Sequence, residues 1–119
     1  MPKISVVIPL YNKGPHIKRA LGSILAQSVA DLDVVVIDDG STDNGAHIVE
    51  QVKDSRIRLL RQENKGVSAA RNRGIREAQS DLIAFLDADD EWEPDHLETL
   101  LFLHREVPEA GAFTTAYKI

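Results

Sequence analysis

Apolar residues in this chain fall into short runs, separated by stretches in which apolar residues recur every three or four positions. Residues 4–10, 32–37 and 82–86 are such runs, and β-branched residues dominate the first two. A nearly continuous apolar run of this length is typical of a strand that is buried on both faces, as in a parallel sheet. Residues 57–60 form a weaker run between arginines, which predicts a strand nearer the edge of the sheet.

The stretches between these runs have helical spacing. Gly14 and the proline after it suit a first helical turn, and the apolar residues that follow lie at i, i+3, i+4, i+7 and i+8. Further helices are predicted after Asp43, over residues 67–78, and from Pro94 onwards. Residues 111–117 predict a fifth strand.

Strands and helices therefore alternate along the chain, which predicts an α/β fold. Because crossovers between parallel strands are right-handed, the expected architecture is a Rossmann-like, mostly parallel sheet with helices on both faces. No linker or internal repeat divides the chain, so residues 1–119 are expected to form one domain. Ligands of such folds bind beyond the carboxyl ends of the strands.

Composition narrows the classes of function. The formal net charge of -5 argues against a nucleic-acid-binding surface, so any nucleotide bound here is expected to be a small one. The absence of cysteine excludes disulfides and thiolate zinc sites, and the histidines lack metal-ligand spacing. The apolar runs are far shorter than the roughly 20 residues of a transmembrane helix. We expect a cytoplasmic protein without a transmembrane segment in this chain.

Asp38 and Asp39 stand at the tip of the second predicted strand. Two adjacent carboxylates repel each other and lose hydration there, so a ligand that donates hydrogens would compensate them. The N–H groups of a base or the hydroxyls of a ribose would serve, and Asp39 in particular fits that role. The alternative is a helix-capping turn, in which Ser41 or Thr42 caps the next helix and Asp43 lies at its positive end.

Asp87 and Asp89 follow the predicted strand over residues 82–86. In an extended segment side chains alternate, so the two carboxylates would project to one side and share a Mg²⁺ or Mn²⁺ ion. Such a metal would act as a Lewis acid on a departing nucleoside diphosphate. An ordinary solvated acidic loop is the alternative, but the position directly after a buried strand favours the metal site.

A third group of residues surrounds the start of the predicted helix over 67–78. The turn 64–66 and the free N–H groups of that helix suit an anion or a neighbouring carboxylate. Arg71 could pair with the acidic loops before metal and substrate arrive, could reach the nucleotide, or could be a solvated surface residue. Tyr11 follows the first strand, where its ring could stack on a base or simply pack.

The remaining polar and aromatic features favour structural roles. Trp92 and Pro94 are expected to anchor the acidic loop and begin a helix. The arginines beside the weaker strand are expected to form an exposed edge, and these are Arg56, Arg58 and Arg61.

Taken together, these residues resemble the family 2 glycosyltransferases, inverting enzymes of the GT-A type that use nucleotide-sugar donors. The matching pieces are residues 5–12, 38–43, 64–66, 70–74 and 87–90. Their order and spacing match the family, and the resemblance covers nearly the whole chain. Five pieces in register are far more specific than a single acidic motif.

The resemblance implies roles for individual residues around a nucleoside-diphosphate sugar. Pro9 and Tyr11 would flank the nucleoside, and Asp39 would contact the base with Asp38 beside it in support. Lys65 and Arg71 would lie near the nucleotide or its acidic neighbours. Asp87 would lie towards the ribose and donor, and Asp89 would be the main ligand of Mn²⁺ or Mg²⁺.

Members of this family usually have a second part that supplies the acceptor pocket and a general base. The resemblance therefore implies that residues 1–119 are the N-terminal, nucleotide-sugar-binding part of a longer enzyme, a truncated GT-A fold whose general base lies beyond Ile119. The acceptor would be a saccharide, lipid or protein. A core surface left exposed by the missing part could also support a homodimer.

Two other functions remain in competition. One is a non-catalytic nucleotide-sugar-binding module that needs a partner chain. The other is a nucleotidyltransferase with a similar layout, although residues 11–14 do not resemble the Gly-rich basic loop of those enzymes.

Overall fold

The predicted strands form one parallel sheet in the computed structural model, which describes residues 2–106. The strands are β1 (Ile4–Leu10), β2 (Leu32–Asp38), β3 (Ile57–Arg61) and β4 (Ile83–Phe85). Within the described residues the sheet has the order β3-β2-β1-β4, and every neighbouring pair is parallel. The α/β class is thereby confirmed, and β3 is an edge strand as predicted. The fifth predicted strand, over residues 111–117, lies outside the described residues.

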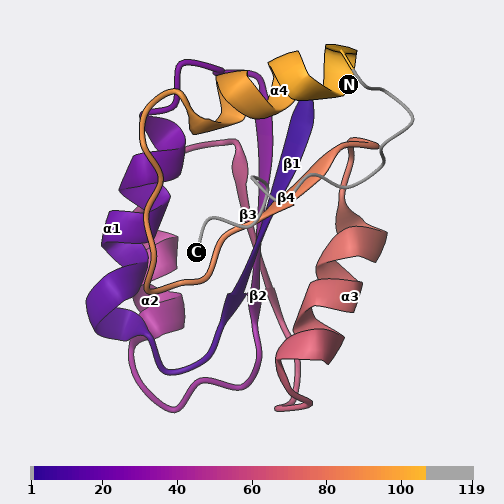
Figure 1. The fold of residues 1–119 in the computed structure, drawn as a ribbon. Coiled ribbons are helices and arrows are strands. Elements are labelled where there is room, and N and C mark those ends of the chain that lie inside the picture. The colour runs from indigo at the N-terminus through magenta and orange to yellow at the C-terminus, as the bar shows by residue number, and fades with distance from the viewer. Residues whose placement is uncertain (1, 107–119) are drawn as a thin grey trace.

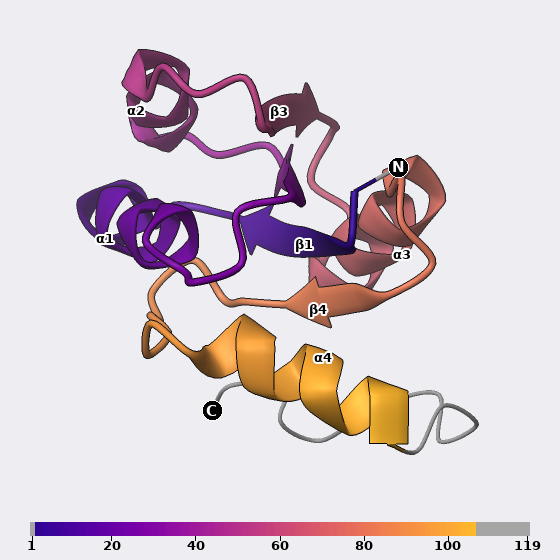
Figure 2. The same ribbon diagram turned by 90° about the horizontal axis from the view of Figure 1, so that it is seen from above.

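Helices cover both faces of the sheet, as the sequence predicts. Helices α1 (Gly14–Leu25) and α2 (Gly45–Gln51) lie on one face, and α3 (Val67–Glu77) lies on the other (Figures 1 and 2). Helix α4 (His96–Glu106) runs beside β4. Even α1, the longest described helix at 12 residues, is too short to cross a bilayer, and none of the described helices qualifies as a membrane span.

Apolar packing explains these positions. The larger core cluster joins β1 and β2 to α1, and Leu97 and Leu100 of α4 belong to it. A smaller cluster of Val35, Ile37 and Ala70 lies under α3. Helix α3 approaches β1 closely because Gly74 carries no side chain, and a Cβ there would overlap Val7.

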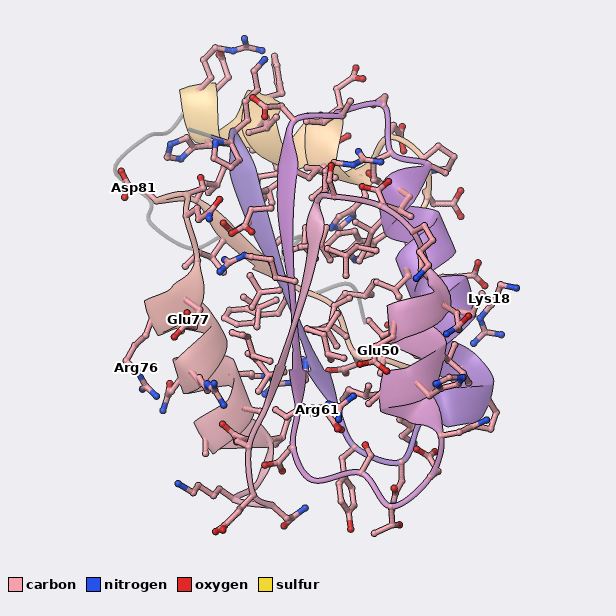
Figure 3. The ribbon with its side chains drawn as sticks, turned by 180° about the vertical axis from the view of Figure 1, so that it is seen from behind. Lys18, Glu50, Arg61, Arg76, Glu77 and Asp81 are labelled. Carbon is pink, nitrogen blue, oxygen red and sulfur yellow. The ribbon has the colours of Figure 1, made fainter. Side chains whose placement is uncertain are left out.

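The edge strand β3 corrects one expectation about its arginines. Arg61 is exposed and pairs with Glu50 of α2 at 3.0 Å (Figure 3). Arg58, in contrast, is only 31% exposed and pairs with the buried Asp33 of β2 at 3.1 Å. The three arginines are therefore not one exposed edge, because Arg58 serves as the counter-ion of a buried carboxylate.

The strand order places a topological switch point between β1 and β4. From β1 the chain adds β2 and then β3 on one side, and it returns to add β4 on the other side. The loop after β1 leads to α1 on one face of the sheet, whereas the loop after β3 leads to α3 on the other face. In open α/β sheets a ligand crevice lies at the carboxyl ends of the strands at such a point. The segment after β4 then runs back along α1 to α4 (Figure 1).

Candidate functional site

A cavity of about 490 Å³ lies at the carboxyl ends of the strands. Its lining comes from the loops after β1, β2, β3 and β4 and from the start of α3. Five residues of the predicted site line it, namely Pro9, Tyr11, Asp39, Asp87 and Asp89. The acidic side chains at the tips of β2 and β4 thus meet around one cavity.

Three other predicted residues do not line the cavity themselves. Asp38 is buried, and its Oδ1 accepts the N–H of Ser41 at 3.2 Å. Lys65 takes part through its backbone N–H, which donates to Asp39. Arg71 reaches the cavity only indirectly, because its Nη2 donates to Oδ1 of Asp87 at 3.2 Å.

Asp39 is buried, with 3% of its surface exposed, and its carboxylate holds the start of α3 in place. Its Oδ1 accepts hydrogen bonds from Nε2 of Gln62 at 2.9 Å and from the N–H of Lys65 at 2.8 Å. Its Oδ2 accepts the N–H of Gly66 at 3.0 Å. Burial alone raises the pKa of Asp39, but these hydrogen bonds outweigh it and hold the pKa below the usual 3.8. The carboxylate is therefore ionised at neutral pH.

Asn12 joins the loop after β1 to the loop after β2. It has φ 51°, and its Oδ1 accepts the N–H of Thr42 at 2.7 Å and the N–H of Asp43 at 3.2 Å. Its own N–H donates to Oγ of Ser41 at 3.0 Å. Asparagine tolerates the left-handed conformation better than most residues. Asn12 thereby fixes the backbone on either side of it, which belongs to Tyr11 and Lys13.

The same loop corrects the predicted helix cap. Helix α2 begins at Gly45, and neither Ser41 nor Thr42 caps it, since both are held by Asn12. Asp43 does lie at the positive end of the helix, because its Oδ1 accepts the N–H of Gly45 at 2.9 Å. Its Oδ2 accepts the N–H of Gly14 at 2.9 Å, so one carboxylate serves the N-termini of α1 and α2.

The acidic segment after β4 is a turn and not an extended strand, contrary to the prediction. The N–H of Asp90 donates to the carbonyl of Asp87 at 3.0 Å. Asp87 and Asp89 still line the same cavity, but each is paired with its own cation. Asp87 pairs with Arg71 at 3.2 Å, which confirms one predicted role of that arginine, and Asp89 pairs with Lys13 at 3.3 Å.

The outer side of this turn is held by α1. Nη2 of Arg19 donates to the carbonyl of Asp89 at 3.1 Å, and Arg19 also pairs with Glu91 at 3.6 Å. Trp92 is 4% exposed and stacks on His96 with ring centroids 4.6 Å apart. The predicted anchoring role of Trp92 is thus confirmed.

The two carboxylates fit a hard divalent cation if a ligand supplies further oxygens. Their side chains are accessible, with 56% of Asp87 and 45% of Asp89 exposed. No group of three or more His, Asp or Glu residues that could hold a metal occurs in residues 2–106. A Mg²⁺ or Mn²⁺ site with only one or two protein carboxylates is ordinary where phosphate oxygens and water complete the shell.

Sequence interpretation missed several residues of the site. Lys13 is the most important of them, because it lines the cavity and is the counter-ion of Asp89. The others were given no role of their own although they lie within the pieces that the sequence had singled out, or directly after one in the case of Val67, and they are Asn64, Gly66, Val67, Ala70 and Ala88. A position within those pieces, or directly adjacent to one, was the available signal.

The fold and the site define a Rossmann-like α/β domain with an acidic crevice at its topological switch point. The chain belongs to glycosyl transferase family 2, whose sequence profile matches residues 5–119. The structure resembles those of GT-A glycosyltransferases, which confirms the expected fold type.

Individual relatives show how much of the family is present. The chain is 43% identical over 106 residues to the uncharacterized glycosyltransferase YibD of Escherichia coli, covering 87% of this chain and 31% of that protein. The crystal structure of S. aureus TarS 1–349 in complex with UDP-GlcNAc is similar, with TM-score 0.81, 29% identity and coverage of 87% and 31%. The mannosyltransferase PcManGT from Pyrobaculum calidifontis, in complex with GDP-Man and Mn²⁺, gives TM-score 0.77, 31% identity and coverage of 84% and 31%. The chain spans about a third of the length of these proteins.

Proposed function

We propose that this chain is the donor-binding part of a longer glycosyltransferase. That enzyme transfers a sugar from a nucleoside-diphosphate sugar to an acceptor hydroxyl, with inversion and with the help of Mn²⁺ or Mg²⁺. The observation that carries the proposal is the meeting of Tyr11, Asp39 and Asp89 around one cavity, although each follows a different strand. The complexes of TarS with UDP-GlcNAc and of PcManGT with GDP-Man and Mn²⁺ support a ligand of this class.

The nucleoside would occupy the part of the cavity beside Tyr11 and Asp39. Tyr11 is 47% exposed, so its ring is available for stacking on a base. Pro9 lines the same cavity and adds apolar surface. The ionised Asp39 would accept a hydrogen bond from the base, while Asp38 shapes the turn beside it through Ser41.

The diphosphate would lie beside Lys13 and the acidic turn. The two ion pairs keep Asp87 and Asp89 neutralised before ligand arrives. Asp87 and Asp89 would hold a divalent cation that is bound with a diphosphate, and Lys13 and Arg71 would then contact phosphate oxygens. When bound, the metal would act as a Lewis acid that neutralises charge on the departing nucleoside diphosphate. Lys65, whose backbone holds Asp39, would stay near the nucleotide through its side chain.

Inversion also requires a general base that takes the proton of the acceptor hydroxyl. Among the carboxylates of the cavity, Asp39 is assigned to the nucleobase and Asp87 and Asp89 to the metal. None of them is therefore assigned as the general base. Because the relatives are about three times as long as this chain, we place the general base and the acceptor pocket in the part that they have in addition. The acceptor class, the homodimer and the cytoplasmic location stay predictions.

Calorimetric titration with UDP, GDP and dTDP, each with and without Mn²⁺, tests the proposal. At least one nucleotide should bind in a Mn²⁺-dependent manner. Asp89→Ala should abolish that Mn²⁺ dependence, and Asp39→Asn should weaken binding by about tenfold or more, because a charged hydrogen bond to the base is lost.

Asp81→Ala is the matched control. Asp81 is exposed and lies near the other end of the molecule, away from the cavity (Figure 3). This variant should bind like the wild type. Equal binding by the wild type, Asp89→Ala and Asp39→Asn would show that the nucleotide site lies elsewhere.

A further inference from the structure

The carboxylate of Asp39 has one hydrogen-bonding site left. An ionised carboxylate offers about four lone-pair sites, two on each oxygen. Oδ1 uses both of its sites, since it accepts from Gln62 at 2.9 Å and from the N–H of Lys65 at 2.8 Å. Oδ2 accepts only the N–H of Gly66, at 3.0 Å. One further donor can therefore be accommodated without displacing a protein group.

The free site lies on the cavity side of the carboxylate. Asp39 and Gly66 line the cavity, whereas Gln62 and Lys65 do not. Oδ1 is therefore occupied by two donors that do not belong to the cavity lining. The oxygen that is shared with Gly66, Oδ2, is the one that a ligand in the cavity can reach.

Nucleobases differ in how many hydrogen-bond donors they can present to the Asp39 carboxylate. Uracil and thymine each carry one imide N–H between two carbonyl groups. Guanine carries two adjacent donors, N1–H and the 2-amino group, which together match the two oxygens of a carboxylate. With Oδ1 already filled, the 2-amino group would lose its water without gaining a partner, and a buried polar group without a partner is costly.

We propose that Asp39 selects a base with a single imide donor, uracil or thymine, and that Gln62 excludes guanine by filling Oδ1. This inference rests on the proposed nucleotide-binding function. Gln62 is half-buried, directly after β3, and acts on the ligand through Asp39. Since similar structures hold UDP-GlcNAc in one case and GDP-Man in another, the shared fold alone does not fix the base.

Titration of the wild-type chain with two matched pairs of nucleotides tests the donor count, at one fixed Mn²⁺ concentration. The first pair is UDP and 3-methyl-UDP, in which a methyl group replaces the imide hydrogen. The second pair is IDP and GDP, which match in size and differ only in the 2-amino group. We expect UDP to bind about tenfold more tightly than 3-methyl-UDP, and IDP about fivefold more tightly than GDP.

Gln62→Met then tests the role of Gln62, because methionine is similar in length and donates no hydrogen bond. This variant frees a site on Oδ1, so the preference for IDP over GDP should fall to less than about twofold. Gln51→Met, at an exposed position of α2, is the matched control and should keep the wild-type ratio. Circular dichroism and thermal unfolding verify that both variants are folded, and the wild-type pairs decide the question if Gln62→Met is not.

The outcomes separate this inference from the function on which it rests. Wild-type binding of GDP as tight as that of IDP, or an unchanged ratio in folded Gln62→Met, would overturn the base selection while leaving nucleotide binding intact. Failure of all four nucleotides to bind would overturn the proposed function together with this inference.

Discussion

Two buried carboxylates lie at opposite ends of β2, and they differ in how completely they are satisfied. Asp33, near the start of the strand, accepts the Ser5 hydroxyl at 2.9 Å, the Gln79 N–H at 2.9 Å, and both Nε and Nη2 of Arg58 at 3.1 Å. Asp39, just past the end of the strand, accepts three donors, none of them from a charged side chain.

The difference separates a structural carboxylate from a binding one. Asp33 accepts four hydrogen bonds, three on Oδ2 and one on Oδ1, which equals the total number of lone-pair sites of an ionised carboxylate and includes two from its counter-ion Arg58. It does not line the cavity at the carboxyl ends of the strands. Asp39 is just as buried, yet it lines the cavity and keeps one acceptor site free. Burial of a charge is therefore not the mark of a site, whereas an incomplete set of donors facing a cavity is.

The largest effect is predicted for a substitution that disrupts the four hydrogen bonds accepted by Asp33. In Asp33→Asn an amide replaces one oxygen, so Ser5, Gln79 and Arg58 no longer find four acceptor sites. We expect the free energy of unfolding to fall by about 2 to 3 kcal/mol, since donors at this buried position lose their partner. Nucleotide affinity of the folded variant should stay within about twofold, because the effect is far from the cavity. Urea denaturation and calorimetric titration measure the two quantities.

Asp81→Asn controls for the change of charge at the same end of the sheet. Asp81 is exposed, so its substitution should change the free energy of unfolding by no more than about 0.5 kcal/mol. A loss of nucleotide binding in folded Asp33→Asn would remove the distinction between the two carboxylates.

The elements of the fold followed from local pattern. The predicted bounds of β1 agree with the structure, and β2 and α3 differ by one residue at one end. These segments are apolar runs or amphipathic repeats of ordinary length, so their own residues decide their structure. Helix α4 begins at His96 instead of Pro94. The N–H of Leu97 in its first turn donates to the side chain of Gln27, which follows α1, and local pattern does not contain this contact.

The partners in the site could not be read from the sequence in the same way. Lys13 meets Asp89 only because the strand order places β1 beside β4, and nothing local to Lys13 indicates this. The cap assigned to Ser41 or Thr42 failed for the same reason, since Asn12 of the preceding loop holds both residues. Motif spacing located the acidic groups, but their counter-ions depend on the order of the strands.

The next largest effect is expected at the cavity end of β2, where Oδ1 of Asn12 accepts the backbone N–H groups of Thr42 and Asp43. Asn12→Gly keeps the left-handed backbone but removes Oδ1, so the backbone N–H groups of Thr42 and Asp43 must turn to water. Tyr11 and Lys13 then lose their fixed backbone, and we expect UDP affinity to fall about fivefold. Asn12→Asp retains the acceptor and should restore affinity to within about twofold of the wild type.

Asn44→Ala is the matched control for this loop, because Asn44 is exposed and makes no side-chain cap bond to α2. It should leave UDP affinity unchanged. A purely structural role for Asn12 would lower the unfolding temperature of Asn12→Gly without changing the UDP dissociation constant, and that result would contradict the prediction.

The smallest effect is expected in the dependence of the unfolding free energy on acidic pH, to which Asp33 and Asp39 should contribute alike. Burial raises the pKa of Asp33, but hydrogen bonds from Arg58, Gln79 and Ser5 outweigh it, so the pKa is held below 3.8, as it is for Asp39. A lowered folded-state pKa contributes stability that is present above the unfolded-state value of 3.8 and is lost as the pH falls towards the folded-state value. The unfolding free energy should therefore decline below about pH 5, and less steeply in Asp33→Asn and in Asp39→Asn.

Urea titrations between about pH 7 and pH 3 measure this decline, with Asp81→Asn as the reference. The pKa of Asp54 is lowered to about 2 by hydrogen bonds with Arg56, so its contribution also begins to be lost as the pH falls through 3.8. Asp54 is common to all these variants, so this contribution cancels in the comparison. Both variants should flatten the acid limb, while only Asp39→Asn also weakens nucleotide binding. Curves parallel to the reference would mean that these hydrogen bonds do not favour the ionised form of either carboxylate, which would contradict the hydrogen-bond sets assigned to Asp33 and Asp39.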